Sequence, residues 1–352
     1  MQNRKARNLK TNTKTATEHS TFELYLHGLG AIIGLGILVL PFLVIALYGA
    51  VSIYMLIAAG FIALLIGMLI YDISLKYKED PYSFLKRTMG KEYAFIYGFL
   101  LIISFLVTTI AAGMASIYEL IYFFNLSAIS SLLIVDIVLI IIGILLFYHA
   151  ERRSMNFIGL LKIFFLLLLI VVGSITVYAV GVHPYPFSFN QSTYNIFGTL
   201  GTFSFVIVLF IWMYGGFESI PIIYRGKDKI KVANALVISI VSAMVLFLIV
   251  QVLAYAISGI EISPIMFNSQ NSIAIFTANM SQILFGNSIT TGVIIGFSIF
   301  VILTLAFAVI NAGNKVLHDL SFDEIIPRFI MRSESYKLLF TVLIPIVVIT
   351  SV

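Results

Sequence analysis

The chain has 352 residues, of which 61% are hydrophobic and only 11% are charged, and its mean hydropathy is +1.08. A water-soluble protein carries about a quarter charged residues to wet its surface, so this composition excludes a soluble fold. The chain contains no cysteine, which excludes disulfides and thiolate metal sites. Its net charge of +5 indicates contact with anionic membrane lipids, and nothing in its pattern points to nucleic acid.

Apolar runs separated by charges or turn residues predict nine membrane-spanning helices. They cover residues 22–47, 50–74, 93–118, 128–148, 155–181, 197–223, 232–259, 289–313 and 337–352. The basic residues test this division, because Lys and Arg accumulate on the cytoplasmic side of a membrane. All 21 of them fall on one side of the predicted spans, whereas loops 182–196 and 260–288 contain none. We therefore expect residues 1–20 to form a cytoplasmic polar tail of a multi-pass cell-membrane protein.

Glycines and prolines interrupt two of these spans. The first contains Gly30, Gly34, Gly36 and Pro41, and the sixth contains Gly215, Gly216 and Pro221. One interpretation is helix packing, since small residues four apart let helices approach closely. The other is an inverted-topology repeat of five spans, because matching interrupted spans mark a midplane binding site in such folds. Gly34 lies about twelve residues, or roughly 18 Å, into its span, which is close to mid-membrane.

A broken helix frees backbone groups that can bind a ligand. N–H groups around Leu35–Ile37 favour an anion such as a carboxylate. Carbonyl groups near Ile32–Ile33 and Trp212–Met213 favour a cation such as an ammonium group. Such a site suits a zwitterion, and it requires that the backbone line a cavity.

The interrupted segments resemble the amino acid–polyamine–organocation (APC) superfamily of permeases. Ile33–Pro41 is similar to the family's I-G-x-G-I-x-x-x-P signature, and Trp212–Ser219 (W-M-Y-G-G-F-E-S) is similar to its sixth-span G-F-E-S segment. After span eight, Lys315, Asp323 and Pro327 match a weaker pattern of a basic residue, an Asp and a Pro. The resemblance extends over the whole chain.

The resemblance implies an all-α polytopic membrane protein with a LeuT-type five-plus-five inverted repeat and discontinuous spans 1 and 6. The first repeat is expected over 21–181 (spans 1–5) and the second over 182–352 (spans 6–9), ending at span 9. Family members usually have a tenth core span, so a partner that supplies this helix is one expectation. The implied function is secondary active transport of amino acids or related amines by alternating access, with a proton or Na+ as the coupling ion. A membrane nutrient sensor that binds amino acids without net transport is the alternative.

The resemblance also assigns site residues. Ile33, Gly34, Leu35 and Gly36 would contact the substrate from span one, although Leu35 stands where many members have Ser or Ala. Trp212, Met213 and Gly215 would line the site from span six. No cofactor or metal is expected, and no arrangement typical of an enzyme is found at membrane depth.

Two ionisable residues inside spans are candidates for coupling or gating. Glu218 matches the sixth-span glutamate of the family, and its structural alternative is to cap the second half-helix. Lys162 lies in span five, where some proton-coupled relatives place a lysine; alternatively, it extends to the lipid headgroups.

Overall fold

The structure, a computed structural model, describes residues 20–77, 79–147, 151–182, 184, 198–224, 229–257, 288–323 and 334–351. Every regular element in this part of the chain is a helix: α2 (Thr21–Ile32), α3 (Leu35–Tyr48), α4 (Val51–Lys76), α5 (Pro81–Thr88), α6 (Lys91–Phe124), α7 (Ala128–Phe147), α8 (Glu151–Val180), α9 (Gly198–Tyr214), α10 (Ser219–Ile223), α11 (Lys229–Ile257), α14 (Ser288–Phe322) and α15 (Glu334–Ser351). The predicted tail up to residue 19 and most of loops 182–196 and 260–288 lie outside the described residues.

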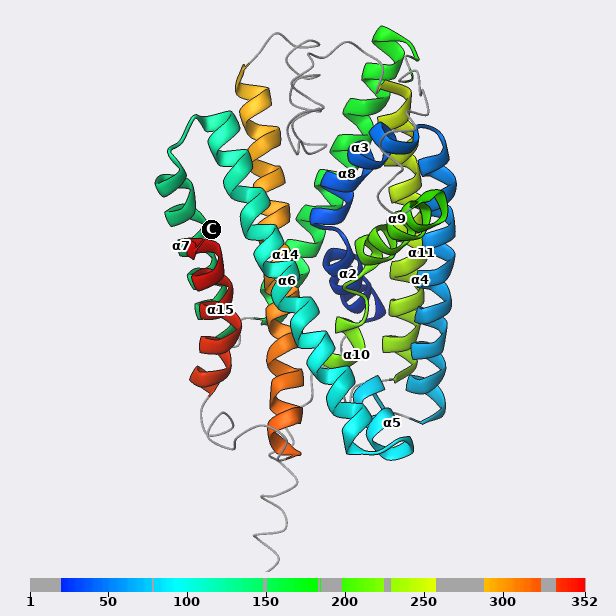
Figure 1. Ribbon diagram of the computed structural model, residues 1–352, viewed down its shortest axis with the longest axis vertical. Helices are drawn as coiled ribbons and strands as arrows, with labels where there is room; N and C mark the ends of the chain where they lie inside the picture. The colour runs from blue at the N-terminus through cyan, green and yellow to red at the C-terminus, as the bar shows by residue number, and fades with distance from the viewer. Residues whose placement is uncertain are drawn as a thin grey trace, which may run out of the picture.

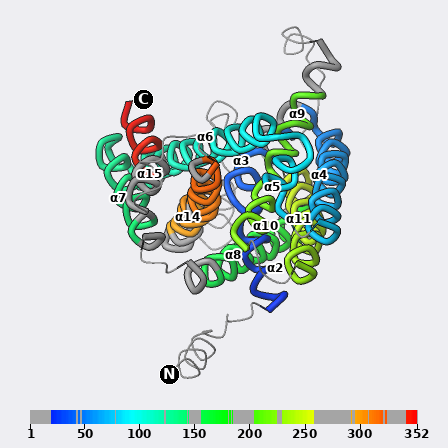
Figure 2. Tube along the Cα trace, turned by 90° about the horizontal axis from the view of Figure 1, so that it is seen from below, coloured from blue at the N-terminus to red at the C-terminus, as the bar shows by residue number. Residues whose placement is uncertain are grey.

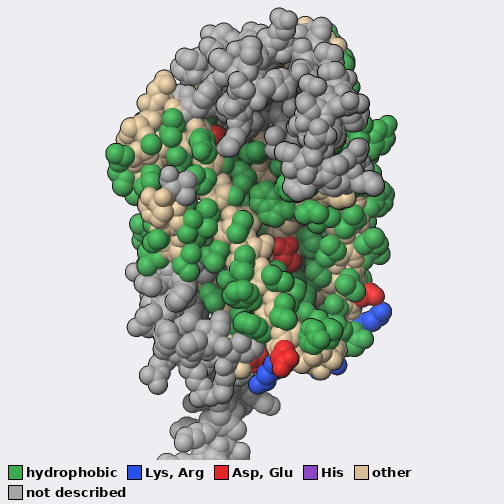
Figure 3. Space-filling view, in the orientation of Figure 1, with side chains coloured by type: hydrophobic (Ala, Val, Ile, Leu, Met, Phe, Trp, Pro, Cys, Tyr) green, Lys and Arg blue, Asp and Glu red, His purple; other side chains and the backbone are tan. Residues whose placement is uncertain are grey.

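The helices form one bundle with its long helices running from end to end (Figure 1). Seen from below, α7 and α15 lie together on one side and α4 and α11 on the other, with α2, α6, α10 and α14 between them (Figure 2). Hydrophobic side chains cover the middle of the visible face, whereas the Lys and Arg side chains seen there lie at the end that holds α5 (Figure 3). This end is called the α5 end below.

Seven of the nine predicted spans correspond to helices that are long and apolar enough to cross a membrane. In the described part of the chain six helices are of this kind, and α2 and α3 taken together as one bent span are the seventh. Two shorter apolar stretches, Ala128–Ile142 and Val342–Ser351, lie in α7 and α15. The nine predicted spans thus each correspond to a helix or a broken helix of a polytopic membrane protein.

The two predicted interruptions are confirmed. The chain bends by 42° between α2 and α3, where Ile33 and Gly34 leave the helix. Between α9 and α10, residues 215–218 form turns, and Gly216 takes a φ of +110°, which favours glycine over residues with a side chain.

The sequence predicts only a basic connection over 75–92, and the structure has a helix, α5, within it. Proline at its first position and Asp80 before it are typical of a helix start. Its Tyr82 hydroxyl donates a hydrogen bond to Asp323 at the end of α14 over 2.8 Å, and Lys86 pairs with the same carboxylate. The loop helix is therefore bound to an element more than 200 residues away.

Helices α2 and α8 touch backbone to backbone. A Cβ placed on Gly30 would lie 2.7 Å from the Gly159 Cα, and one on Gly159 would lie 2.5 Å from the Leu26 carbonyl oxygen. Both distances are shorter than a Cβ atom can approach another heavy atom without displacing it. Glycine is required at this crossing, as in other closely packed membrane helices.

Replacing Gly159 by Val should destabilise the protein by roughly 1–3 kcal/mol, because the new side chain has no room against the α2 backbone. The matched control is Gly296→Val, since a Cβ there meets nothing within 4 Å among the described residues. Thermal unfolding of the purified variants in detergent measures the difference. Equal melting temperatures for the two variants would refute the close α2–α8 contact.

Candidate functional site

The two helix breaks face each other in the middle of the bundle. A Cβ on Gly36 would lie 2.8 Å from the Met213 Cα, so α3 passes α9 with almost no space between the backbones. On the other side of the breaks, a Cβ on Gly216 would lie 2.4 Å from the Ala31 carbonyl oxygen. The glycines therefore allow the end of α2, the start of α3 and the α9–α10 turn to meet.

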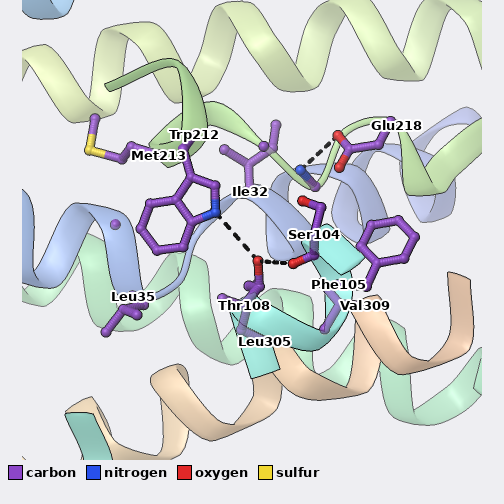
Figure 4. A pocket seen from close by; sticks show the side chains of 13 residues that line it. Ile32, Leu35, Ser104, Phe105, Thr108, Trp212, Met213, Glu218, Leu305 and Val309 are labelled. Carbon is purple, nitrogen blue, oxygen red and sulfur yellow. Dashed lines mark hydrogen bonds between the residues drawn. The ribbon is translucent and has the colours of Figure 1, made fainter. Parts of the chain in front are cut away.

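A cavity lies beside this junction. Its cavity volume is about 40 Å³, so as it stands it is much smaller than the roughly 300–1,000 Å³ typical of ligand sites. Figure 4 shows the side chains that surround it. Its walls are formed by Ile32, Leu35, Gly36, Ser104, Phe105, Thr108, Trp212, Met213, Gly215, Gly216, Glu218, Leu305 and Val309.

Most of the residues proposed from the sequence meet at this cavity. Leu35 and Gly36 line it from α3, and Trp212, Met213 and Gly215 line it from α9 and the turn that follows, together with Glu218. Two others flank it: Ile33 is 1% exposed and ends α2, and Gly34 packs against the Leu305 side chain.

The start of α3 offers backbone donors to the cavity. Gly34 is the N-cap residue and has no side chain that could bond the first N–H groups of the helix. These groups, on Leu35, Gly36 and the next residue, have no partner within the helix. They carry the partial positive charge of a helix N-terminus, which favours an anion.

The carbonyl groups of the breaks differ in how they are bonded. The Trp212 carbonyl, which the sequence suggested as a cation ligand, accepts the Gly215 N–H at 2.9 Å. Its second lone pair stays available to a ligand. Ile32, the last residue of α2, lines the cavity itself.

Glu218 is half-buried at the edge of the cavity, just before α10. Its side chain makes no capping bond to α10; instead, its Oε2 accepts the Gly216 N–H at 2.8 Å (Figure 4). The Glu218 side chain thus binds the turn between the half-helices and places a carboxylate at an otherwise largely apolar cavity.

The opposite wall of the cavity was not recognised from the sequence. It consists of Ser104, Phe105 and Thr108 on α6 and Leu305 and Val309 on α14. The Trp212 indole N–H donates to the Thr108 hydroxyl at 3.4 Å, and that hydroxyl donates to the Ser104 carbonyl at 2.8 Å. Two small polar residues four apart in an apolar span form one face of a helix, and this spacing was the available signal.

Lys162 lies at the break of α2 and outside the cavity. Its side chain is fully buried, and its Nζ donates to the Gly30 carbonyl at 2.8 Å. Gly30 is in the last turn of α2, where carbonyl groups lack a helical partner. The side chain therefore does not extend to the lipid headgroups, which was the structural alternative for this residue.

Within the described ranges, no three His, Cys, Asp or Glu side chains are grouped so that they could hold a metal ion.

Comparison with known proteins places this geometry in a family. The sequence matches the amino acid permease family over residues 20–352. Among curated proteins, no sequence matches the chain. Among solved structures, the chain is similar to the manganese transporter of Eremococcus coleocola, crystallised in complex with an aromatic bis-isothiourea substituted compound. The TM-score is 0.57 at 13% sequence identity, over 97% of this chain and 73% of that one.

That likeness concerns the fold, and it confirms the LeuT-type architecture with interrupted first and sixth spans. The family match covers nearly all of the sequence, and the helices that could cross a membrane agree with it. The chain therefore belongs to the amino acid permease family and is a multi-pass membrane transporter.

Proposed function

We propose that the protein is a secondary active transporter that moves amino acids or closely related amines across the cell membrane by alternating access. The observation that carries this proposal is the cavity at the junction of the two broken helices, lined from both of them. The basic residues of the sequence support an orientation with the α5 end in the cytoplasm.

The backbone of the breaks suits the two charged groups that all α-amino acids share. The substrate carboxylate would accept hydrogen bonds from the first N–H groups of α3, at Leu35 and Gly36. The ammonium group would face the carbonyl groups at the ends of α2 and α9 and the Glu218 carboxylate. This arrangement satisfies backbone groups that would otherwise face an empty cavity inside the membrane.

The substrate side chain would face the wall formed by α6 and α14. Phe105, Leu305 and Val309 make this wall apolar, and Ser104 and Thr108 add only hydroxyl groups. An ionised substrate side chain would lose its hydration there without gaining a charged partner, and this loss is costly. The proposed substrates are therefore neutral amino acids with apolar side chains.

Coupling is proposed to run through Lys162 and protons. The lysine joins α8 to the last turn of α2, next to the break that would hold the substrate. Loss of a proton would remove its positive charge and so weaken its bond to the Gly30 carbonyl, since charged donors bond about twice as strongly as neutral ones. Protonation would thereby change how firmly α2 is held.

Purified protein in liposomes should accumulate labelled leucine or valine under an inward pH gradient. Uptake of lysine or aspartate should be lower by a factor of about ten or more. A thermal-shift series with the same amino acids gives binding independently of transport. Stabilisation without accumulation would identify the sensor alternative. No stabilisation by any amino acid or amine would contradict the proposed function.

Replacing Lys162 by Met should abolish uptake driven by a pH gradient while binding of the amino acid persists, because the proton-carrying group is lost but the cavity lining is kept. Lys76→Met is the matched control, since Lys76 is an exposed lysine paired with Asp72 on its own helix. Proton-driven uptake by the Lys162 variant at the control level would rule out this coupling role.

Glu218→Gln should retain more thermal stability than Glu218→Ala, because the amide oxygen still accepts the Gly216 N–H. The alanine variant leaves that donor without its partner, at a cost of roughly 1–3 kcal/mol. Both variants should bind the substrate more weakly, since each removes the carboxylate. Equal melting temperatures for the two variants would show that the Gly216 bond contributes little.

A further inference from the structure

A second lysine bond, half-buried, joins α14 to α10 on the α5 side of the cavity. Lys315 lies on α14, six residues beyond Val309, or roughly 9 Å further toward the α5 end. Its Nζ donates to the carbonyl of Ile223 at 2.8 Å. Ile223 is the last residue of α10 and lies five residues beyond Glu218. The bond therefore connects α14, which lines the cavity, to the short helix that follows the cavity-lining Glu218.

The position of this bond suits a cation. Helix α10 has only five residues, so it gains little stability from its own hydrogen bonds. Its final carbonyl groups receive no hydrogen bond from an N–H group within the helix, and they carry partial negative charge. A half-buried ammonium group satisfies one of them and attaches the short helix to α14.

Helix α10 is also bound to α2. The Tyr224 hydroxyl and the His27 Nδ1 lie 3.0 Å apart, and the two rings meet edge to face with centroids separated by 5.1 Å. One turn away, a Cβ on Gly28 would lie only 2.3 Å from the Ile220 Cδ1, so the two helices pack closely. Helices α2 and α10, joined by these contacts, are here called the gate pair.

Two lysines bond to the gate pair, which also packs against α8, α11 and α14. Lys162 of α8 donates to the Gly30 carbonyl in the last turn of α2, and Lys315 of α14 donates to the Ile223 carbonyl at the end of α10. Both bonds end on backbone at the C-terminal end of a half-helix. Movement of α10 away from α14 requires that the Lys315 bond break.

We propose that Lys315 is the positioning residue that keeps the transport path closed on the α5 side by holding α10 against α14. This inference rests on the proposed function, because a path that opens on alternate sides is meaningful only for a transporter. Substrate release toward the α5 end then begins with loss of the Lys315–Ile223 bond. Lys315 itself does not line the cavity, so it acts on access and leaves the binding contacts unchanged.

The absence of native cysteine allows a direct test, because one introduced thiol is the only reactive one. Ser104→Cys places this reporter in the cavity wall on α6. Its rate of modification by a membrane-impermeant maleimide is measured from each side, in inside-out and right-side-out vesicles. The rate is compared in the parent reporter, Lys315→Met, Lys315→Arg and Lys76→Met.

Lys315→Met should raise the modification rate from the α5 side about tenfold, as expected when one bond to a charged group is lost from the closed state. From the opposite side the rate should fall. Lys315→Arg retains a charged donor and should remain near the parent rate, as should the exposed control Lys76→Met. A merely structural role would lower the melting temperature and leave the side preference of the reporter unchanged.

Unchanged side preference in folded Lys315→Met overturns the proposal, and so does an equal shift in Lys76→Met. If the methionine variant does not fold, Lys315→Gln is measured against the same outcomes. Thermal shifts and uptake of the parent protein separate the two levels of inference. If the parent protein transports amino acids and the Lys315→Met variant keeps the side preference of the parent, only the proposed role of Lys315 is refuted. If the parent protein neither binds nor transports amino acids, the proposed function is refuted.

Discussion

Backbone groups inside a membrane need partners within the protein, and two helices of this protein end in mid-bundle. A continuous helix pairs its own N–H and C=O groups, and lipid offers no substitute where the helix stops. The structure meets this need locally: Lys162 binds the Gly30 carbonyl, Glu218 binds the Gly216 N–H, and Trp212 and Gly215 bond to each other. The groups that remain, chiefly at the start of α3, face the cavity. The binding site follows from the interruption of the helices.

The cavity has two chemically different walls, and they contribute different parts of recognition. The wall at the breaks presents backbone dipoles and the Glu218 carboxylate, which suit groups common to all amino acids. The wall of α6 and α14 presents Phe105, Leu305 and Val309, which decide among side chains. Fold alone does not determine what a transporter carries, so selectivity has to be sought in the second wall.

Sequence patterns predicted the broken spans and the wall at the breaks, because glycine, proline and a charged residue within an apolar run are local signals. They did not predict the wall of α6 and α14. Phe105, Leu305 and Val309 look like any other lipid-facing or core residue, and only three-dimensional packing turns them toward the cavity. The partner of Lys162 was equally hidden, since Gly30 lies 132 residues away in the chain. The sequence does not predict helix α5 because it is only eight residues long and lies within a basic loop between two apolar spans.

The crossing of Gly30 and Gly159 sets where α2 is fixed in the bundle. Most packed helices interlock through side chains, so that rotation of one past the other must first separate ridges from grooves. At this crossing the two backbones meet with no side chain between them. The other contacts of α2 are of the usual kind, because Leu24, Leu29 and Ile32 lie in the hydrophobic core. Any tilt of α2 would therefore have to repack these side chains, whereas at the glycine crossing it would not.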